Sequence, residues 1–280
     1  MAADGANVVV LAKTTTPQAR IEGTIYDTEK AVLAAGGRCL AIGLDVRNED
    51  AVRDAIDRTI STFGGIDVVV NNASAMHPHR FQDLDVKKFN LMNDVIVRGS
   101  FLVTKYSHPH LQKSTAPHVL NICPPIHIVD TWFKYLGHLA VMKYAVSLST
   151  LSLSQDLFED GIAVNALWPK TAFWSAFMSR AGGYTDSLRQ FSRKPDIMSD
   201  AAYCMITKDP KVYTGNFMYD DDVLLAEGVT DFEAYAEVPG NPLIVDIFVR
   251  EEDCKTFTPL TSADEATRNV QKMLAIKPKL

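Results

Sequence analysis

Residues 162–171 read Ile-Ala-Val-Asn-Ala-Leu-Trp-Pro-Lys-Thr. The stretch is apolar through Trp168 apart from one asparagine, and Pro169 ends it. Short apolar runs of this kind, with turn residues at their ends, are typical of strands that are buried on both faces of a parallel sheet. The sequence therefore predicts a buried parallel strand from Ile162 to Trp168.

Apolar runs on either side of this stretch predict the other strands. They are Val8 to Leu11, Cys39 to Leu44, Asp67 to Asn71, His118 to Ile122 and Thr214 to Tyr219. Segments with helical character lie between and beside them, at Glu29 to Ala35, Asp50 to Phe63, Val86 to Ser114, Gly137 to Phe158 and Asp200 to Thr207. Alternating strands and helices imply right-handed βαβ units. We therefore expect a doubly wound α/β domain with a mainly parallel sheet.

The amino-acid composition limits the classes of protein to which this chain can belong. The chain has 280 residues, of which 47% are hydrophobic and 22% charged, so a sizeable core is possible. A formal net charge of −6 without a Lys/Arg cluster argues against nucleic-acid binding. No apolar stretch approaches the ~18 residues that span a bilayer. The cysteines are widely spaced, which favours reduced thiols in an intracellular compartment.

The sequence offers no convincing metal site. His77-Pro-His79 and His108-Pro-His110 have no Asp, Glu or Cys to complete a ligand set. Asp220-Asp221-Asp222 lacks the alternating ligands and the glycine of a calcium loop. We expect no metal ion, and a solvated acidic loop at 220–222.

Three segments, in this order and spacing, resemble the short-chain dehydrogenase/reductase family: Asn71-Asn-Ala-Ser74 after a strand, His118-Val-Leu-Asn-Ile122, and Val164 to Thr171. The resemblance covers residues 1–245 and implies a Rossmann-type sheet, an NADP cofactor and carbonyl/alcohol redox chemistry. It also implies a peroxisomal or mitochondrial location; a cytoplasmic one is the alternative. Residues 246–280 are charged and lose periodicity, so we expect a loose C-terminal tail there.

The resemblance places a glycine-rich phosphate loop after the first strand of the family. No G-x-x-x-G-x-G occurs in these 280 residues, and the first strand found here resembles the second of the family. We therefore expect a sheet that lacks the family's first strand and its glycine-rich loop. That strand lies between the second and the fourth, and its loss forfeits roughly 8–15 kcal/mol of apolar burial. Either the flanking strands pair directly, a partner fills the gap, or the sequence is incomplete.

Five residues match positions that the resemblance assigns to NADP. Lys13 matches the basic residue near the 2′-phosphate, Asp45 the adenine contact and Asn71 the ribose contact. Thr171 matches the carboxamide contact, and Lys143 matches a further cofactor-binding position of the family. The absence of an acidic residue at position 13 favours NADP over NAD. A solvated lysine at a strand end accounts equally well for Lys13, and Asp45 and Asn71 also suit ordinary strand-end caps. Without the phosphate loop we expect poor affinity for NADP.

Catalysis in the family uses a tyrosine with a lysine four residues later, a serine and an asparagine. The i, i+4 spacing puts the tyrosine and the lysine on one helix face, where the ammonium lowers the tyrosine pKa. Lys143 matches the lysine, but Leu139 occupies the tyrosine position, Pro124 the serine position and Ile96 the asparagine position. None of these three side chains can transfer a proton.

These replacements favour a catalytically inactive or severely impaired member of the family. Two alternatives remain open. One is an NADP-dependent oxidoreductase that uses an unrecognised acid on a steroid- or lipid-like carbonyl or alcohol. The other is a non-enzymatic protein whose long helices bind a second copy or an intact relative, without nucleic acid or a membrane span.

Overall fold

The computed structural model describes residues 1–17, 23–77, 79–128, 130–175, 178 and 186–259. All strand pairs found there are parallel. The strands are β1 (Asn7–Ala12), β2 (Arg38–Gly43), β3 (Val68–Asn71), β4 (His118–Ile122), β5 (Ala163–Trp168) and β6 (Phe217–Tyr219). The predicted doubly wound α/β fold is confirmed, and each of the six predicted strands overlaps an observed one.

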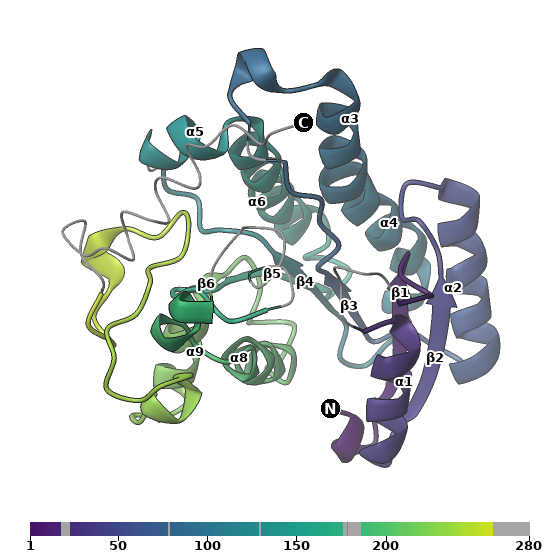
Figure 1. The fold of residues 1–280 in the computed structure, drawn as a ribbon. Coiled ribbons are helices and arrows are strands. Elements are labelled where there is room, and N and C mark those ends of the chain that lie inside the picture. Colours follow the sequence, from purple (N-terminus) through teal and green to yellow (C-terminus); the bar gives the residue numbers. More distant parts are fainter. Residues whose placement is uncertain (18–22, 78, 129, 176–177, 179–185, 260–280) are drawn as a thin grey trace.

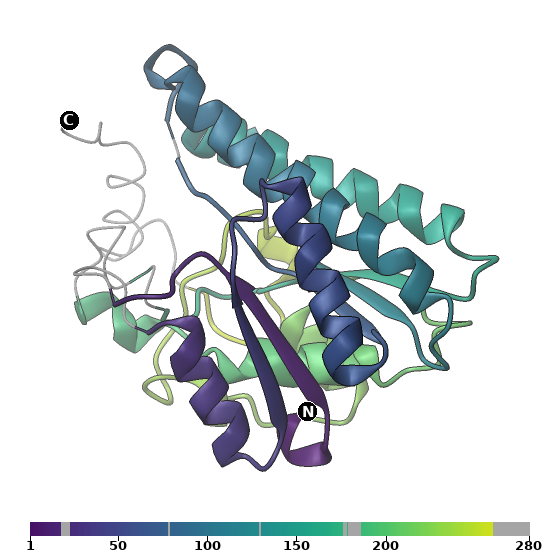
Figure 2. The same ribbon diagram turned by 90° about the vertical axis from the view of Figure 1, so that its right-hand side faces the viewer.

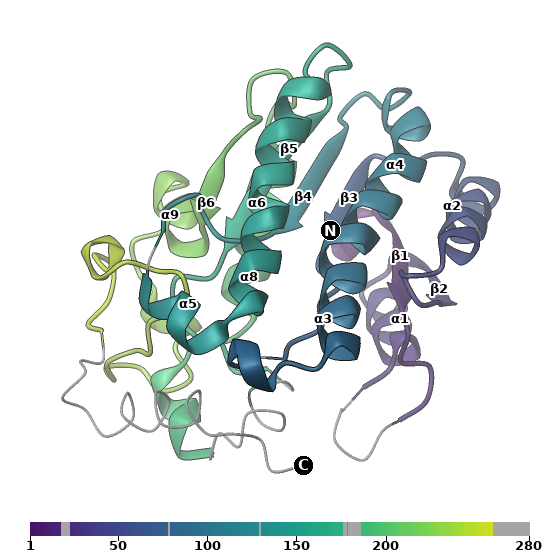
Figure 3. The same cartoon turned by 90° about the horizontal axis from the view of Figure 1, so that it is seen from above.

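The strands form two separate sheets. β1 pairs with β2, and β3, β4, β5 and β6 form a second sheet in that order. Figures 1 and 3 place β1 between β2 and β3 across the molecule. Within the described residues no strand pairing joins β1 to β3. The sheet is therefore interrupted at the position that the family's first strand occupies. The two strands on either side of this position, β1 and β3, do not pair directly within the described residues.

Helices cover both faces of these sheets (Figure 2). The main helices are α1 (Ile25–Ala34), α2 (Glu49–Phe63), α3 (Val86–Met92), α4 (Gly99–Leu111), α5 (Asp130–Leu136), α6 (His138–Asp156), α8 (Asp196–Ile206) and α9 (Asp220–Ala226). Figure 1 shows α4 and α6 on one side of the larger sheet and α8 on the other. Within the described residues, no helix combines the length and the apolar character that a membrane crossing requires.

Local sequence signals account for several helix ends. Thr24 and Asp27 form a capping box at the start of α1, and the Asn48 side chain accepts a hydrogen bond from the Ala51 N–H at the start of α2. Gly64, with a φ of 88°, ends α2 in the left-handed conformation. The long helix predicted from Val86 to Ser114 is instead α3, a π-helical segment Asn93–Arg98 and α4.

Helix α2 connects the two sheets through the core. Val52 and Ala55 pack in one apolar cluster with Ile42 of β2, and Val9 of β1 packs against that cluster. One turn after Val52, Ile56 packs in a second cluster with Val69 of β3. Helix α2 therefore packs against both sheets.

Two sequence-based expectations are wrong. The tail expected from residue 246 packs through residue 259: Phe248 and Val249 are buried, and the Phe248 ring lies against Trp168 and Tyr144. The apolar run Ile247 to Val249 is too short to show a helical or strand period in this charged stretch, so the sequence did not predict the packing. Residues 260–280 lie outside the described residues. The acidic segment is not a solvated loop either, because Asp220 and Asp221 are fully buried at the start of α9.

Candidate active site

Lys143 lies on α6 in a nearly closed environment. Its side chain is 8% exposed, and its Nζ donates a hydrogen bond to the Ile122 carbonyl at 3.2 Å. The same Nζ lies 5.1 Å from the centre of the Trp168 ring. Burial lowers the pKa of Lys143 to about 8, since a charged ammonium is costly away from water.

The residues at the three replaced positions are all buried. Leu139, one turn before Lys143, is fully buried, and Ile96 is 2% exposed in the same apolar cluster. Pro124 is also buried, and its carbonyl accepts a hydrogen bond from the Ser147 hydroxyl at 2.7 Å. Core packing therefore occupies the positions where the resemblance expects proton-transferring groups.

Other ionisable groups in this region have hydrogen-bond partners or pKa values that burial raises. The Tyr144 hydroxyl donates to the His127 carbonyl at 2.5 Å, and the Tyr219 hydroxyl lies 3.1 Å from His127 Nε2. Burial raises the pKa of the Cys123 thiol. Burial also raises the pKa of Asp246, to about 7, although Lys143 acts in the opposite direction. The hydroxyl of Tyr144 is thus committed to the backbone.

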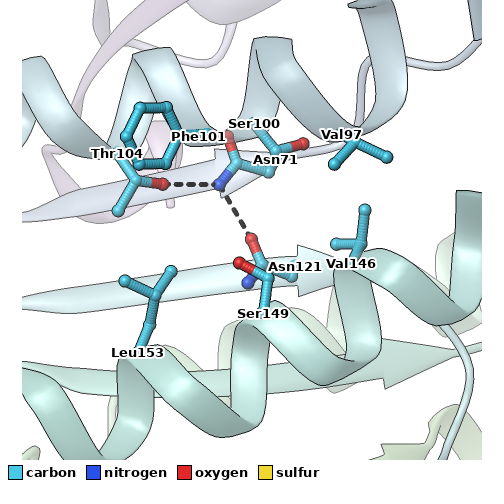
Figure 4. A pocket seen from close by; sticks show the side chains of 9 residues that line it. All are labelled: Asn71, Val97, Ser100, Phe101, Thr104, Asn121, Val146, Ser149 and Leu153. Atoms are coloured by element: carbon cyan, nitrogen blue, oxygen red, sulfur yellow. Dashed lines mark hydrogen bonds between the residues drawn. The ribbon is translucent and has the colours of Figure 1, made fainter. Parts of the chain in front are cut away.

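Asn71, at the end of β3, belongs to a polar network inside the molecule (Figure 4). Its Nδ2 donates to Thr104 Oγ1 at 2.9 Å and to Asn121 Oδ1 at 2.8 Å. The Nδ2 of Asn121 donates in turn to Thr150 Oγ1. A small pocket above this network is lined by α4 and α6. The amide of Asn71 therefore joins β3 to β4 and to α4.

Lys13 and Asp45 lie together where β1 and β2 end. Asp45 accepts two side-chain hydrogen bonds from Arg47, at 2.9 and 2.6 Å, and Lys13 Nζ lies 3.3 Å from the same carboxylate. The hydrogen bonds from Arg47 hold the pKa of Asp45 well below its usual range. Lys13 is exposed, whereas the Asp45 carboxylate is already neutralised by its own chain.

The described residues fit only part of an NADP molecule. Thr171 is fully buried, and its Oγ1 has no hydrogen-bond partner among the described residues, so it could form the carboxamide contact. The Lys13 side chain is exposed, so its ammonium could contact a phosphate group. Asp45 and Asn71 are engaged within the chain, and no glycine-rich loop among the described residues offers backbone N–H groups to a pyrophosphate. The residues present therefore do not fit the whole dinucleotide.

The structure contains a buried ion-pair network that was not predicted from the sequence. Lys170 Nζ lies 2.7 Å from Asp221 Oδ1 and 2.5 Å from Asp222 Oδ1, and Arg193 lies 3.6 Å from Asp221. Asp220 Oδ1 accepts the backbone N–H of Lys170. Burial, and then the neighbouring Asp221, raise the pKa of Asp220 to about 7. Lys170 and Asp220 are 50 positions apart in the sequence, so no local sequence pattern could have predicted that they lie together.

Comparison with known proteins gives consistent matches. Residues 1–199 match the family described as Enoyl-(Acyl carrier protein) reductase. The chain is 42% identical over 251 residues to hydroxysteroid dehydrogenase-like protein 2 from Bos taurus and 44% identical over 248 residues to the protein of that name from Danio rerio. These matches cover 90% and 89% of this chain but only 59% of each relative, so the chain spans about three fifths of their length.

Solved structures agree in fold. A short chain dehydrogenase from Mycobacterium thermoresistibile matches with a TM-score of 0.85 and 40% identity, over 92% of this chain and 91% of that chain. A short chain dehydrogenase from Burkholderia cenocepacia, solved in complex with NADP, matches with a TM-score of 0.63 and 24% identity, over 78% of this chain and 87% of that chain. The second likeness concerns the fold alone.

Proposed function

This chain belongs to the short-chain dehydrogenase/reductase family, and from that premise we propose that it is a catalytically inactive or severely impaired member. One observation carries the proposal: Leu139, Ile96 and Pro124, which occupy the positions where the resemblance expects proton-transferring groups, are all buried. General acid–base catalysis is worth roughly 10²–10⁴-fold, and lost positioning of the substrate adds to the deficit.

The test is turnover by the 280-residue chain. NADPH oxidation is followed with aldehydes, ketones and steroids, alongside a relative that keeps all four catalytic residues. We expect no oxidation above the rate without protein. Steady oxidation that disappears in the Lys143→Ala variant would overturn the proposal and favour the alternative, an NADP-dependent oxidoreductase with another acid.

We further propose that these 280 residues bind NADP weakly. The side chains of Asp45 and Asn71 support this, because they already form hydrogen bonds within the chain. The Burkholderia cenocepacia protein, which has a similar fold, was solved in complex with NADP. Titration of NADPH by nicotinamide fluorescence should show no saturation in the low micromolar range. A saturable signal in that range, weakened by Lys13→Ala, would contradict weak binding and confirm a role for Lys13.

A second candidate function is suggested by the outer surface of α4 and α6. Four large apolar side chains are 44–57% exposed there and form what we call the α4/α6 apolar face: Phe101, Val141, Leu148 and Leu151. Exposed apolar patches of this kind mark protein–protein contacts. They support binding of a second copy or an intact relative, with or without catalysis.

A further inference from the structure

Residues 243–259 form a strap that lies against the candidate site. In Figures 1 and 3 the strap lies beyond β6, at the outer edge of the larger sheet. Its backbone pairs with the segment that follows β5: the Asp246 N–H donates to the Lys170 carbonyl at 3.1 Å, and Val245 forms an antiparallel bridge with Thr171. The strap therefore runs directly beside the residue that matches the carboxamide contact.

The middle of the strap packs against the surroundings of Lys143. The Phe248 ring is fully buried, in the same apolar cluster as Leu139, and its centre lies 5.6 Å from the centre of the Trp168 ring. The Lys143 ammonium lies 5.1 Å from the centre of that Trp168 ring. The Trp168 indole N–H donates to the Ile247 carbonyl at 2.8 Å. Trp168 thus contacts both the strap and the lysine, and displacement of the strap would uncover its indole.

The far end of the strap is attached through side chains near the surface. The Thr256 hydroxyl donates a hydrogen bond to Asp221 Oδ2, and the Arg193 guanidinium lies 5.2 Å from the centre of the Phe257 ring. None of residues 252–259 is buried, whereas every residue of β5 is buried. Because local opening follows the density of buried contacts, the strap should open at a lower free energy than β5.

Asp246 places a carboxyl group of the strap among charged groups of other elements. Burial raises its pKa to about 7, and the Asp220 carboxylate of α9 acts in the same direction. The Ile247 N–H, which donates to Asp246 Oδ1 at 2.7 Å, and the Lys143 ammonium of α6 act against this rise. Above pH 7 the carboxylates of Asp246 and Asp220 are both ionised and repel each other, so opening of the strap separates like charges.

Asp220 connects this carboxyl group to the buried ion pairs. Burial and then the neighbouring Asp221 raise the pKa of Asp220 to about 7, whereas the Arg193 guanidinium acts to lower it. Lys170, whose N–H donates to Asp220 Oδ1, contacts Asp221 with its ammonium at 2.7 Å. The cations of Lys170 and Arg193 therefore lie closest to Asp221, the carboxylate that also accepts the hydroxyl of Thr256.

We propose that the strap is a lid over the candidate site, and that the carboxyl group of Asp246 makes its opening more frequent as pH rises. When the strap opens, the pKa of Asp246 returns toward the unfolded value of about 3.9. Protonation of Asp246 therefore favours the closed strap fully below pH ~4, and this contribution is lost as pH rises through the folded value of about 7. The lid controls access to Trp168 and Lys143 whether or not the site is catalytic, so it does not depend on the proposed function.

Native-state hydrogen exchange of the 280-residue chain, observed by NMR, tests the lid. The readouts are the strap amides of Ile244 and Asp246, the indole N–H of Trp168 and the amides of β5, with each rate divided by the intrinsic rate at the same pH. Between pH 5 and pH 7.5 the opening constant of the strap should rise roughly tenfold or more, and the Trp168 indole should follow it. Strap amides that exchange only as slowly as the β5 amides would overturn the lid.

The carboxyl group is tested by Asp246→Asn. Asparagine keeps the oxygen that accepts the Ile247 N–H, so the strap should still close, but its opening constant should no longer depend on pH. Glu252→Gln is the control, because it alters an exposed carboxylate of the same strap and should keep the pH dependence. A pH dependence that survives Asp246→Asn would overturn the role of this residue.

The attachment at the far end is tested by Thr256→Val. Valine cannot donate to Asp221, so the opening constant should rise roughly fivefold or more at both pH values. Thr258→Val makes the same change at an exposed position two residues away and should leave the opening constant unaltered. Equal effects of the two variants would show that the Thr256 hydroxyl does not hold the strap closed, against the proposal.

Discussion

At the scale of single residues, the candidate site is decided by what packs around Lys143. Its ammonium is held by a carbonyl and a ring face, and the side chain one turn earlier is leucine. Since none of the three replacing side chains can transfer a proton, our proposal is that Lys143 keeps its position in the fold but not its role in catalysis. The consequences can be tested by returning a hydroxyl to the site.

Leu139→Tyr should not restore turnover. Leu139 is fully buried, so the larger ring overpacks the core and should cost about 1–3 kcal/mol of the free energy of unfolding. Pro124 and Ile96 still supply neither a substrate contact nor a proton path. Thermal melting and NADPH oxidation check both parts. Leu139→Met, which conserves volume, is the control and should cost less than about 1.5 kcal/mol. Measurable turnover by the tyrosine variant would mean that one hydroxyl suffices.

Asp220→Asn should change how stability depends on pH. The folded pKa of Asp220, about 7, lies above the unfolded value of about 3.9, so its protonation stabilises the fold below pH ~4 and that contribution is lost as pH rises through 7. Asparagine keeps the oxygen that accepts the Lys170 N–H. The variant should match the unaltered chain near pH 4 and exceed it by about 2–4 kcal/mol at pH 8, measured by urea unfolding. A pH-independent difference would rule out this titration.

At the scale of elements, the sequence predicted regular strands well and isolated contacts poorly. The strand from His118 to Ile122 was predicted to the residue, because a buried parallel strand is a continuous apolar run. α5 and α9 were missed, since each has seven residues and too few turns for a helical period to show. Within the site, Leu139 was identifiable by its spacing from Lys143, whereas the burial of Asp220 depends on Lys170 and could not be read locally.

The α4/α6 apolar face should govern self-association. Leu148→Arg places a charge on that face, so any dimer should dissociate at a concentration at least tenfold higher, as measured by analytical ultracentrifugation. Leu33→Arg is the matched control, because Leu33 is 55% exposed on α1 and Leu148 is 57% exposed on α6. We expect the control to associate like the unaltered chain. If both variants dissociate alike, the contact does not lie on this face.

At the scale of the whole molecule, the two sheets differ in how firmly they are held. β4 and β5 are almost wholly buried, whereas β1 pairs with one neighbour and has no buried residue. The apolar clusters of α2 connect these unequal parts. Because local unfolding follows buried contacts, we expect the smaller sheet to open at a lower free energy than the larger one.

Val52→Ala tests this order of opening. Val52 is fully buried in the cluster that joins α2 to β1 and β2, so its truncation should lower the opening free energy of the β1–β2 amides by about 2 kcal/mol. The β4–β5 amides should change by less than about 1 kcal/mol, since they do not touch that cluster. Val164→Ala is the counterpart in β5; it should lower both sets, because the smaller sheet packs through α2 on the larger one. Native-state hydrogen exchange measures all four changes. If Val52→Ala lowered both sets equally, the chain would unfold as one unit across the interruption, and the connection through α2 would have to be as strong as a paired strand.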